Sequence, residues 1–281
     1  MVNIVKASGE TAEFDANKLR RSLKRVGTNP SIIEKIVTEV KRALKPGMST
    51  HAIYQIAFRL LRKASHTLAA KYHLKQAIMR LGSSGYPFEK YMAALLRYHG
   101  YQVENNKFIK GYCVSHEVDV LAKGHGKRIF VECKYHNRSG LRCDVKVALY
   151  VKARFQDIDQ AYKNKSDHDV LEGWLATNTR FTIDAMQYAR CAGLHLVAWD
   201  YPKTGNLKEL IEFSGLYPIS CITNFTKAEL GELIENNVIL CKSLHEQPDL
   251  LESFKIPKIR KESILKQCRE LCLPVEKPWI I

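Results

Sequence analysis

Residues 116–134 constrain the fold more strongly than any other stretch of this chain. Two runs of strand-forming residues, 117–122 and 128–134, flank a turn that contains Gly124 and Gly126, and this pattern predicts a β-hairpin. Alternate residues of a strand share a face. One face of the hairpin is therefore expected to carry the apolar side chains Val118, Val120, Val131 and Cys133.

Three charged residues of the hairpin are expected on the opposite face. A turn centred between residues 125 and 126 places Asp119 directly across from Glu132, and Lys134 lies two residues further along. Like charges on cross-strand partners, roughly 5 Å apart, repel each other. A hard cation such as Mg²⁺, or Mn²⁺ in its place, would relieve this repulsion and could activate water against a phosphate. An exposed hairpin with an ordinary ion pair is the alternative interpretation.

The composition favours a polyanionic partner. The 281 residues include 44 Lys and Arg against 29 Asp and Glu, a net charge of +15 that is spread along most of the chain. No apolar run approaches the ~20 residues of a membrane span, and the N-terminus has no apolar signal region, so we expect a cytoplasmic protein. A protein that is merely basic remains the alternative.

The eight cysteines are typical of reduced thiols rather than of a disulfide scaffold. The spacing Cys113-x2-His116 and Cys133-x2-His136 could be interpreted as a zinc site. Residues three apart on a strand point to opposite sides, however, and Cys133 belongs to the apolar face. We therefore favour buried cysteines over zinc.

The first part of the chain is predicted to be mainly helical. Residues 3–14 form a small hairpin, and helices follow at about 16–26, 30–44, 50–64 and 66–81, before a Gly-Ser-Ser-Gly linker ending at Gly85. This segment resembles the ATP cone, the nucleotide-sensing domain of ribonucleotide reductases. The matching motifs are Val5-Lys6-x2-Gly9, Glu13-Phe14-Asp15-x2-Lys18-Leu19, Ser49-x3-Ile53 and Tyr72-x-Leu74-x2-Ala77-Ile78.

The cone resemblance implies a site for ATP or dATP. Lys6 and Lys18 are the implied phosphate ligands, with Ser49 and Ile53 near the nucleotide. Two residues depart from the family pattern, because Ala7 stands where Arg is frequent and Tyr54 where His is frequent. A cone kept only as a scaffold is the alternative.

The second part is predicted to be an α/β domain. A helix over 87–99 carries Glu89 at the border of its buried stripe, as a site residue or as a first-turn partner of the helix dipole. A strand near 101–104 precedes the hairpin. The strand 174–177, helix 182–191 and apolar strand 194–199 imply a parallel crossover and a sheet covered on both faces.

A basic loop and helix follow the hairpin. Residues 135–142 are polar and basic and lead into a helix over 144–158 that carries Lys146, Lys152 and Arg154. Beside a metal site such residues would contact phosphates of DNA, and we name Arg138, Arg142 and Lys146 as candidates. A solvated helix face is the alternative.

This order of elements resembles the PD-(D/E)xK nucleases, and most closely Mrr-type restriction endonucleases. The motifs are Gly85-x2-Phe88-Glu89, Leu95-Leu96-x3-Gly100-Tyr101-x-Val103, Glu117-Val-Asp119, Val131-Glu132-Cys133-Lys134 and Thr177-Asn178-x2-Phe181-Thr182. The resemblance implies Asp119 and Glu132 as metal ligands, Lys134 as the catalytic lysine and Glu89 as a further ligand. Many relatives have Gln in place of Glu132. Asn178 is interpreted first as a turn residue.

The predicted organisation has three parts. An ATP-cone-like domain spans 1–83, a restriction-endonuclease-like mixed sheet with helices on both faces spans 84–215, and a helical region with weak helix-hairpin-helix likeness spans 216–281. We expect a Mg²⁺-dependent deoxyribonuclease of restriction type, homo-oligomeric and regulated by ATP or dATP. A repair or junction nuclease is one alternative. A nucleotide-sensing DNA-binding regulator is the other, although the zinc ribbon of cone-bearing repressors is absent from the sequence.

Overall fold

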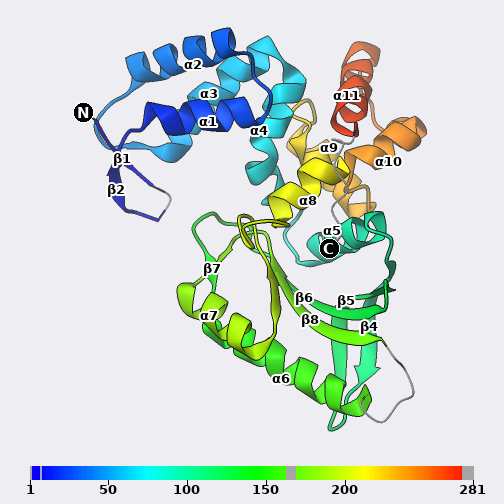
Figure 1. Cartoon of the computed structure of the whole chain (residues 1–281). Helices are drawn as coiled ribbons and strands as arrows, with labels where there is room; N and C mark the ends of the chain where they lie inside the picture. The colour runs from blue at the N-terminus through cyan, green and yellow to red at the C-terminus, as the bar shows by residue number, and fades with distance from the viewer. Residues whose placement is uncertain (1, 7, 163–168, 274–281) are drawn as a thin grey trace.

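The computed structural model describes residues 2–6, 8–162 and 169–273, so Ala7 lies outside the described residues. Figure 1 shows a helical amino-terminal part beside a mixed β-sheet, with a second group of helices packed over one end of the sheet. The sequence-predicted fold class is confirmed.

The amino-terminal part is a helical bundle capped by a small sheet. Its strands β1 (Asn3–Val5), β2 (Thr11–Glu13) and β3 (Met48–Ser49) pair in the order β2-β1-β3. The helices are α1 (Ala16–Arg25), α2 (Pro30–Ala43), α3 (Thr50–Ala64) and α4 (His66–Ile78). Each helix is capped at its start by a side chain that accepts a hydrogen bond from a backbone N–H. The capping residues, in the order of the helices, are Asp15, Asn29, Ser49 and Ser65. These caps explain why the sequence located the helix starts correctly.

The central sheet has the order β10-β8-β6-β5-β4. Its strands are β4 (Gln102–Lys110), β5 (Ser115–Gly124), β6 (Lys127–Lys134), β8 (Val170–Thr177) and β10 (His195–Val197). Strands β4, β5 and β6 are antiparallel, whereas β6, β8 and β10 run parallel, as the crossover pattern predicted. Strand β4 is longer than the 101–104 expected from sequence. A two-stranded sheet of β7 (Arg142–Cys143) and β9 (Arg180–Phe181) was not predicted.

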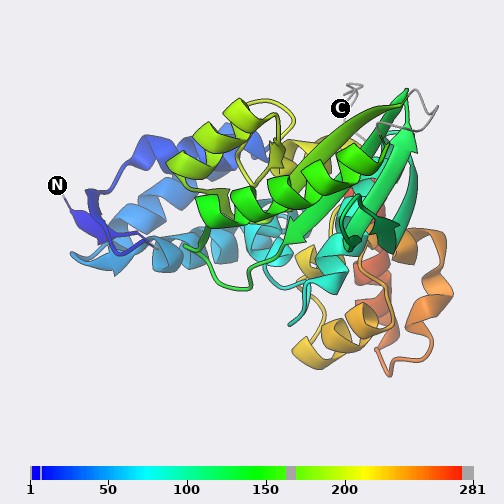
Figure 2. The ribbon, with the colours of Figure 1, turned by 90° about the horizontal axis from the view of Figure 1, so that it is seen from below.

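Helices cover both faces of the central sheet. Helix α6 (Val145–Tyr162) and helix α7 (Ile183–Ala192) lie across one face (Figure 2). Helix α5 (Tyr86–Tyr98) packs on the other face. Gly193, in the left-handed conformation, ends α7.

The carboxy-terminal part is helical. It contains α8 (Leu207–Ser214), which the sequence analysis missed, and then α9 (Lys227–Glu235), α10 (Cys241–Glu246) and α11 (Lys258–Leu271). A 3₁₀ turn covers Pro248–Leu251, and another covers Ile219–Cys221. These elements share one hydrophobic core with α5 and the sheet.

Helix α4 joins the amino-terminal bundle to the rest of the molecule. Ala69 lies in the core of the bundle, whereas Leu74, Ala77 and Ile78 lie in the core of the sheet and the carboxy-terminal helices. The Ser220 hydroxyl also donates a hydrogen bond to the Ala77 carbonyl (2.7 Å). Because α4 serves two cores, the amino-terminal bundle is held against the carboxy-terminal helices.

Candidate active site

The β5–β6 hairpin has the register that its turn predicted. The pairs run from Val120–Val131 to Gly124–Lys127, and the turn residues His125 and Gly126 both have positive φ, 52° and 69°. Such a two-residue turn matches the twist of the strands that it joins. The same register, continued by one residue, sets Asp119 opposite Glu132.

The expected apolar face is interrupted at Asp119. Val118 packs with Phe130 and Phe155 on the α6 side, whereas Val120 belongs to the core on the α5 side. The prediction that the two valines share a face was therefore wrong. Asn106, between the β4–β5 pairs that flank Asp119, has a φ of 51°, so the strand pair departs from regular alternation there.

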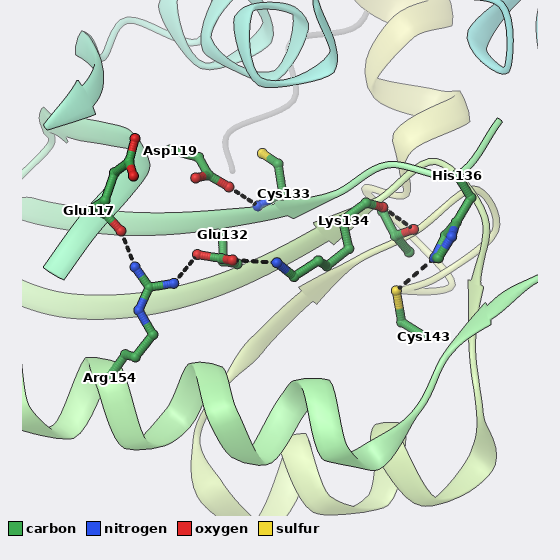
Figure 3. A network of polar contacts seen from close by, with 9 residues as sticks. Glu117, Asp119, Glu132, Cys133, Lys134, His136, Cys143 and Arg154 are labelled. Atoms are coloured by element: carbon green, nitrogen blue, oxygen red, sulfur yellow. Dashed lines mark hydrogen bonds and ion pairs between the residues drawn. The ribbon is translucent and has the colours of Figure 1, made fainter. Parts of the chain in front are cut away.

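This irregularity frees the Asp119 side chain to contact β6. Its Oδ2 accepts a hydrogen bond from the Cys133 N–H at 2.7 Å (Figure 3). The carboxylate occupies the place where β5 would otherwise continue the backbone ladder, since the described pairs end at Val120–Val131. Asp119 and Glu132 are thus held at one end of the β5–β6 ladder.

Glu132 is buried between two cations. The Lys134 ammonium lies 2.6 Å from Oε1, and the Arg154 guanidinium of α6 contacts Oε2 (Figure 3). Arg154 also donates to the Glu117 carbonyl. In the sequence, Arg154 is only one of several basic residues on the predicted helix. No local pattern identifies its partner, because that contact depends on how α6 packs against the sheet.

The Asp119 carboxyl carries the clearest electrostatic signal of a site. Burial, followed by the negative charge of Glu132, raises its pKa to about 7, against the opposing effect of the Cys133 N–H. The charge of Glu89 adds to the rise and that of Lys134 reduces it. Repulsion between two neighbouring carboxylates is what a bound divalent cation would relieve, so Asp119 and Glu132 fit a metal site.

Lys134 is held as an ammonium. Burial lowers its pKa, but the hydrogen bond and the charge of Glu132, with the charge of Asp119, outweigh burial and leave the pKa raised. Its backbone is fixed to the parallel neighbour β8, because the Thr177 hydroxyl donates to the Lys134 carbonyl (2.7 Å). The backbone of Lys134 is therefore anchored to β8, and its ammonium is paired with Glu132.

Glu89 is not assembled into a three-carboxylate cluster. It is half-buried in the first turn of α5, and its Oε2 accepts a hydrogen bond from the Asn106 amide at 2.9 Å. Within residues 2–6, 8–162 and 169–273, no three His, Cys, Asp or Glu side chains are placed to hold a metal ion. Mg²⁺ is commonly bound by one or two carboxylates and completed by water, so a third protein carboxylate is not a requirement of such a site. A metal-binding role for Glu89 stays a prediction.

The residues of the zinc alternative are engaged elsewhere. Cys133 is buried in the core, as favoured from the sequence, and Cys113 is exposed. His116 pairs with Asp157 of α6 (2.7 Å), and His136 contacts the Cys143 sulfur (3.4 Å).

The loop after β6 carries the candidate DNA contacts. Buried Asn178 fixes it by accepting from the His136 N–H (2.9 Å) and donating to the His136 carbonyl (2.7 Å), in agreement with a turn residue. Arg138, Arg142 and Lys146 are exposed around this loop and at the start of α6. Their contact with DNA stays a prediction.

The candidate nucleotide-binding residues are spread over the small β-sheet and the helices of the amino-terminal bundle. Ser49 pairs with Val5 in the β1–β3 ladder, so Lys6 follows directly beside it, and the Ser49 hydroxyl caps α3. Lys18 is exposed on the first turn of α1, and Ile53 is buried in the bundle core. The Lys6 ammonium pairs with Glu10 (3.0 Å).

A residue of the restriction-endonuclease-like part affects the pKa of a carboxyl in the β1–β2 hairpin. The hydrogen bond and charge of Lys6 lower the pKa of Glu10, and Arg142 of β7 contributes a smaller effect in the same direction. The hairpin of β1 and β2 therefore lies near Arg142, one of the candidate DNA contacts.

Three family models match this chain. The ATP cone domain model matches residues 2–78, the restriction endonuclease model residues 81–203, and the AF1548-like C-terminal model residues 217–272. Both resemblances drawn from the sequence are confirmed. The fold and the site thus define a restriction-endonuclease-like protein with an ATP cone at its amino-terminal end.

Two relatives specify the family further. An uncharacterized protein of Archaeoglobus fulgidus is 37% identical over 153 residues, which cover 54% of this chain and 83% of the relative. A second relative is the protein of unknown function AF1548, whose crystal structure matches this chain with a TM-score of 0.54 and 30% sequence identity. The match covers 67% of this chain and 98% of that protein. The chain belongs to the family of these AF1548-like proteins.

No described helix is both long and apolar enough to cross a membrane.

Proposed function

We propose that this protein is a metal-dependent DNA endonuclease of restriction type, with Asp119, Glu132 and Lys134 as its catalytic group. The observation that carries the proposal is the half-buried Asp119, whose pKa is raised by burial and by the charge of buried Glu132, together with the Lys134 ammonium 2.6 Å from Glu132 Oε1. This arrangement lies within the part matched by the restriction endonuclease model. The net charge of +15 suits a polyanionic substrate.

Each residue has a distinct role in the proposed hydrolysis. Asp119 and Glu132 would hold the metal ion, Mg²⁺ or alternatively Mn²⁺, and the bound ion would activate water and neutralise phosphate charge. Lys134 orients the attacking water or stabilises negative charge that develops on the phosphate. Arg138, Arg142 and Lys146 contact backbone phosphates. ATP or dATP, bound near Lys6, Lys18, Ser49 and Ile53, is the proposed effector.

Conversion of supercoiled plasmid in Mg²⁺ and in EDTA, with and without ATP, tests this function. Mg²⁺-dependent nicking is expected from the wild type, and Glu132→Ala is expected to abolish it because one of two metal-binding carboxylates is lost. Glu104→Ala, which removes an exposed carboxylate on β4, serves as the control and should cut normally. A four-way junction and a methylated plasmid extend the substrate panel.

Thermal melts test whether Glu132→Ala is folded, because the change leaves Lys134 and Arg154 without their shared partner. Wild-type-like cutting by a folded Glu132→Ala protein would exclude the proposed site.

Arg154 is predicted to compete with the metal for Glu132. Its guanidinium contacts Oε2 of Glu132, an oxygen atom that the proposed metal ion would bind. Arg154→Met is therefore expected to increase Mn²⁺ affinity several-fold, measured by titration calorimetry without DNA. Arg97→Met, on the exposed side of α5, should leave Mn²⁺ affinity unchanged. Weaker Mn²⁺ binding by Arg154→Met would show instead that the guanidinium positions Glu132 for the metal.

A further inference from the structure

A long groove separates the amino-terminal bundle from the carboxy-terminal helices. Its main cavity, about 1090 Å³, lies between α3, α4 and the segment that leads into α9. A second cavity of about 620 Å³ continues along α3 and shares Gln55, Phe58 and Arg62 with the first. Neither cavity is lined by the candidate nucleotide-binding residues of the amino-terminal bundle. The carboxylates of the proposed nuclease site do not line them either. The groove is thus a separate feature with no assigned ligand.

The groove carries positive charge that the protein does not neutralise. Arg62, Arg80 and Lys227 line the main cavity, and Arg59 and Lys63 line its continuation. None of these five side chains forms an ion pair with a described residue. Glu235 is the one carboxylate among the described residues that line the two cavities. An anionic ligand would complete this charge balance.

Aromatic rings are interleaved with these cations. Tyr54, Phe58, Tyr86 and Phe225 line the main cavity, and Tyr86 is 46% exposed. The Tyr54 and Phe58 rings stack with centroids 5.7 Å apart. Burial and the charge of Arg80 lower the pKa of His73 to about 4, so this ring is neutral and accepts or donates a hydrogen bond with the Tyr54 hydroxyl. Rings beside unpaired cations suit a ligand that has both planar groups and phosphates.

The length of the groove exceeds that of one nucleotide. From His51 to Lys63 the lining residues follow α3 for roughly 18 Å, at 1.5 Å per residue. Arg59, Arg62 and Lys63 line the second half of this path, and Arg80, just after α4, and Lys227, at the start of α9, line the main cavity. In a duplex the base faces are covered by stacking, whereas a single strand exposes them to protein rings.

We propose that the groove between α3, α4 and α9 binds single-stranded nucleic acid. Arg62, Arg80 and Lys63 hold successive phosphates, and Tyr86 with Phe225 stacks against bases. This binding is independent of the proposed hydrolysis, because it needs neither metal nor the Asp119–Glu132 pair. The groove is a second surface for nucleic acid, separate from the proposed nuclease site, and holds an unpaired strand.

Fluorescence anisotropy with labelled dT12 and U12, in EDTA, tests the proposal on the full-length chain. The variant Arg62→Glu/Arg80→Glu is expected to lose at least tenfold in affinity for a single strand, while duplex affinity changes less than threefold. The control Lys24→Glu/Lys35→Glu makes the same charge change on exposed bundle positions outside the groove. It should leave the single-strand affinity within about threefold of the wild type. The dT12 and U12 arms show whether the strand is DNA or RNA.

Tyr86→Ala separates base stacking from charge. It is expected to weaken single-strand binding about tenfold with no change in net charge. Equal losses in the groove variant and the control variant would overturn the proposal, since the effect would then be general electrostatics. Loss of ATP binding with retained dT12 and U12 binding in Arg62→Glu/Arg80→Glu would also overturn it, in favour of a mononucleotide site. Plasmid cleavage, assayed separately, reports on the nuclease proposal alone.

Discussion

Asp119→Asn is expected to reduce Mg²⁺-dependent plasmid cleavage by at least a thousandfold. The asparagine keeps the size of the side chain and an oxygen that can accept from the Cys133 N–H. It removes one of the two negative charges that the proposed metal site contributes. Initial rates of nicking at saturating Mg²⁺ and calorimetric Mn²⁺ titrations measure the effect, and both catalysis and metal affinity should fall.

The same change is expected to stabilise the metal-free protein at alkaline pH. The native pKa of Asp119, about 7, lies above its ordinary value of 3.8, so the folded state holds this proton more tightly than the unfolded state. Stability from this group is therefore complete below pH 3.8 and is lost as the pH rises through 7. At 1.36 kcal/mol per pKa unit the ionised form costs about 4 kcal/mol, before solvent screening reduces the cost.

Melting curves in EDTA at two pH values isolate this effect. Asp119→Asn should melt several degrees above the wild type at pH 8 and at nearly the same temperature at pH 5, where Asp119 is neutral. Asp184→Asn, an exposed change of the same type on α7, controls for net charge. An equal or lower melting temperature of Asp119→Asn at pH 8 would mean that neither burial nor the charge of Glu132 makes the ionised Asp119 costly in the folded protein.

The sequence located the hairpin because its information is local. The positions of Gly124 and Gly126 set the turn, and a two-residue turn fixes the register of both strands. Helix starts were equally accessible, since Asp15, Asn29, Ser49 and Ser65 cap their own helices. Both features depend on residues fewer than about fifteen positions apart.

Features that depend on packing were missed or wrong. Strict alternation placed Val118 with Val120, but the irregularity opposite Asn106 moves it to the α6 face. The Arg154–Glu132 contact joins residues 22 positions apart in different elements. The groove forms only where α3 and α4 meet the segment around α9. The sequence assigned α3 and α4 to the first predicted domain and α9 to the last. No local pattern encodes such meetings.

The packing of helix α4 is another feature that could not be predicted from the sequence. Its motif residues Leu74, Ala77 and Ile78 supported the cone resemblance, and a cone helix would be expected to face its own bundle. In the structure these three side chains are buried in the shared core with the carboxy-terminal helices. A nucleotide-dependent change in the bundle would therefore act on the carboxy-terminal helices directly, through packed side chains rather than through a flexible linker.

Lys134→Met is expected to slow the cleavage step about 10²–10³-fold, the loss seen when one preorganised donor to a developing charge is removed. Metal affinity should not fall, because the ammonium competes with the metal for Glu132 rather than helping to bind it. Single-turnover cleavage at saturating protein, with Mn²⁺ calorimetry, separates the two quantities. The control Lys146→Met removes an exposed cation at the start of α6 and should weaken DNA binding and its salt dependence without slowing the single-turnover step. If Lys134→Met matched that control in its single-turnover rate, Lys134 would bind DNA and another group would stabilise the transition state.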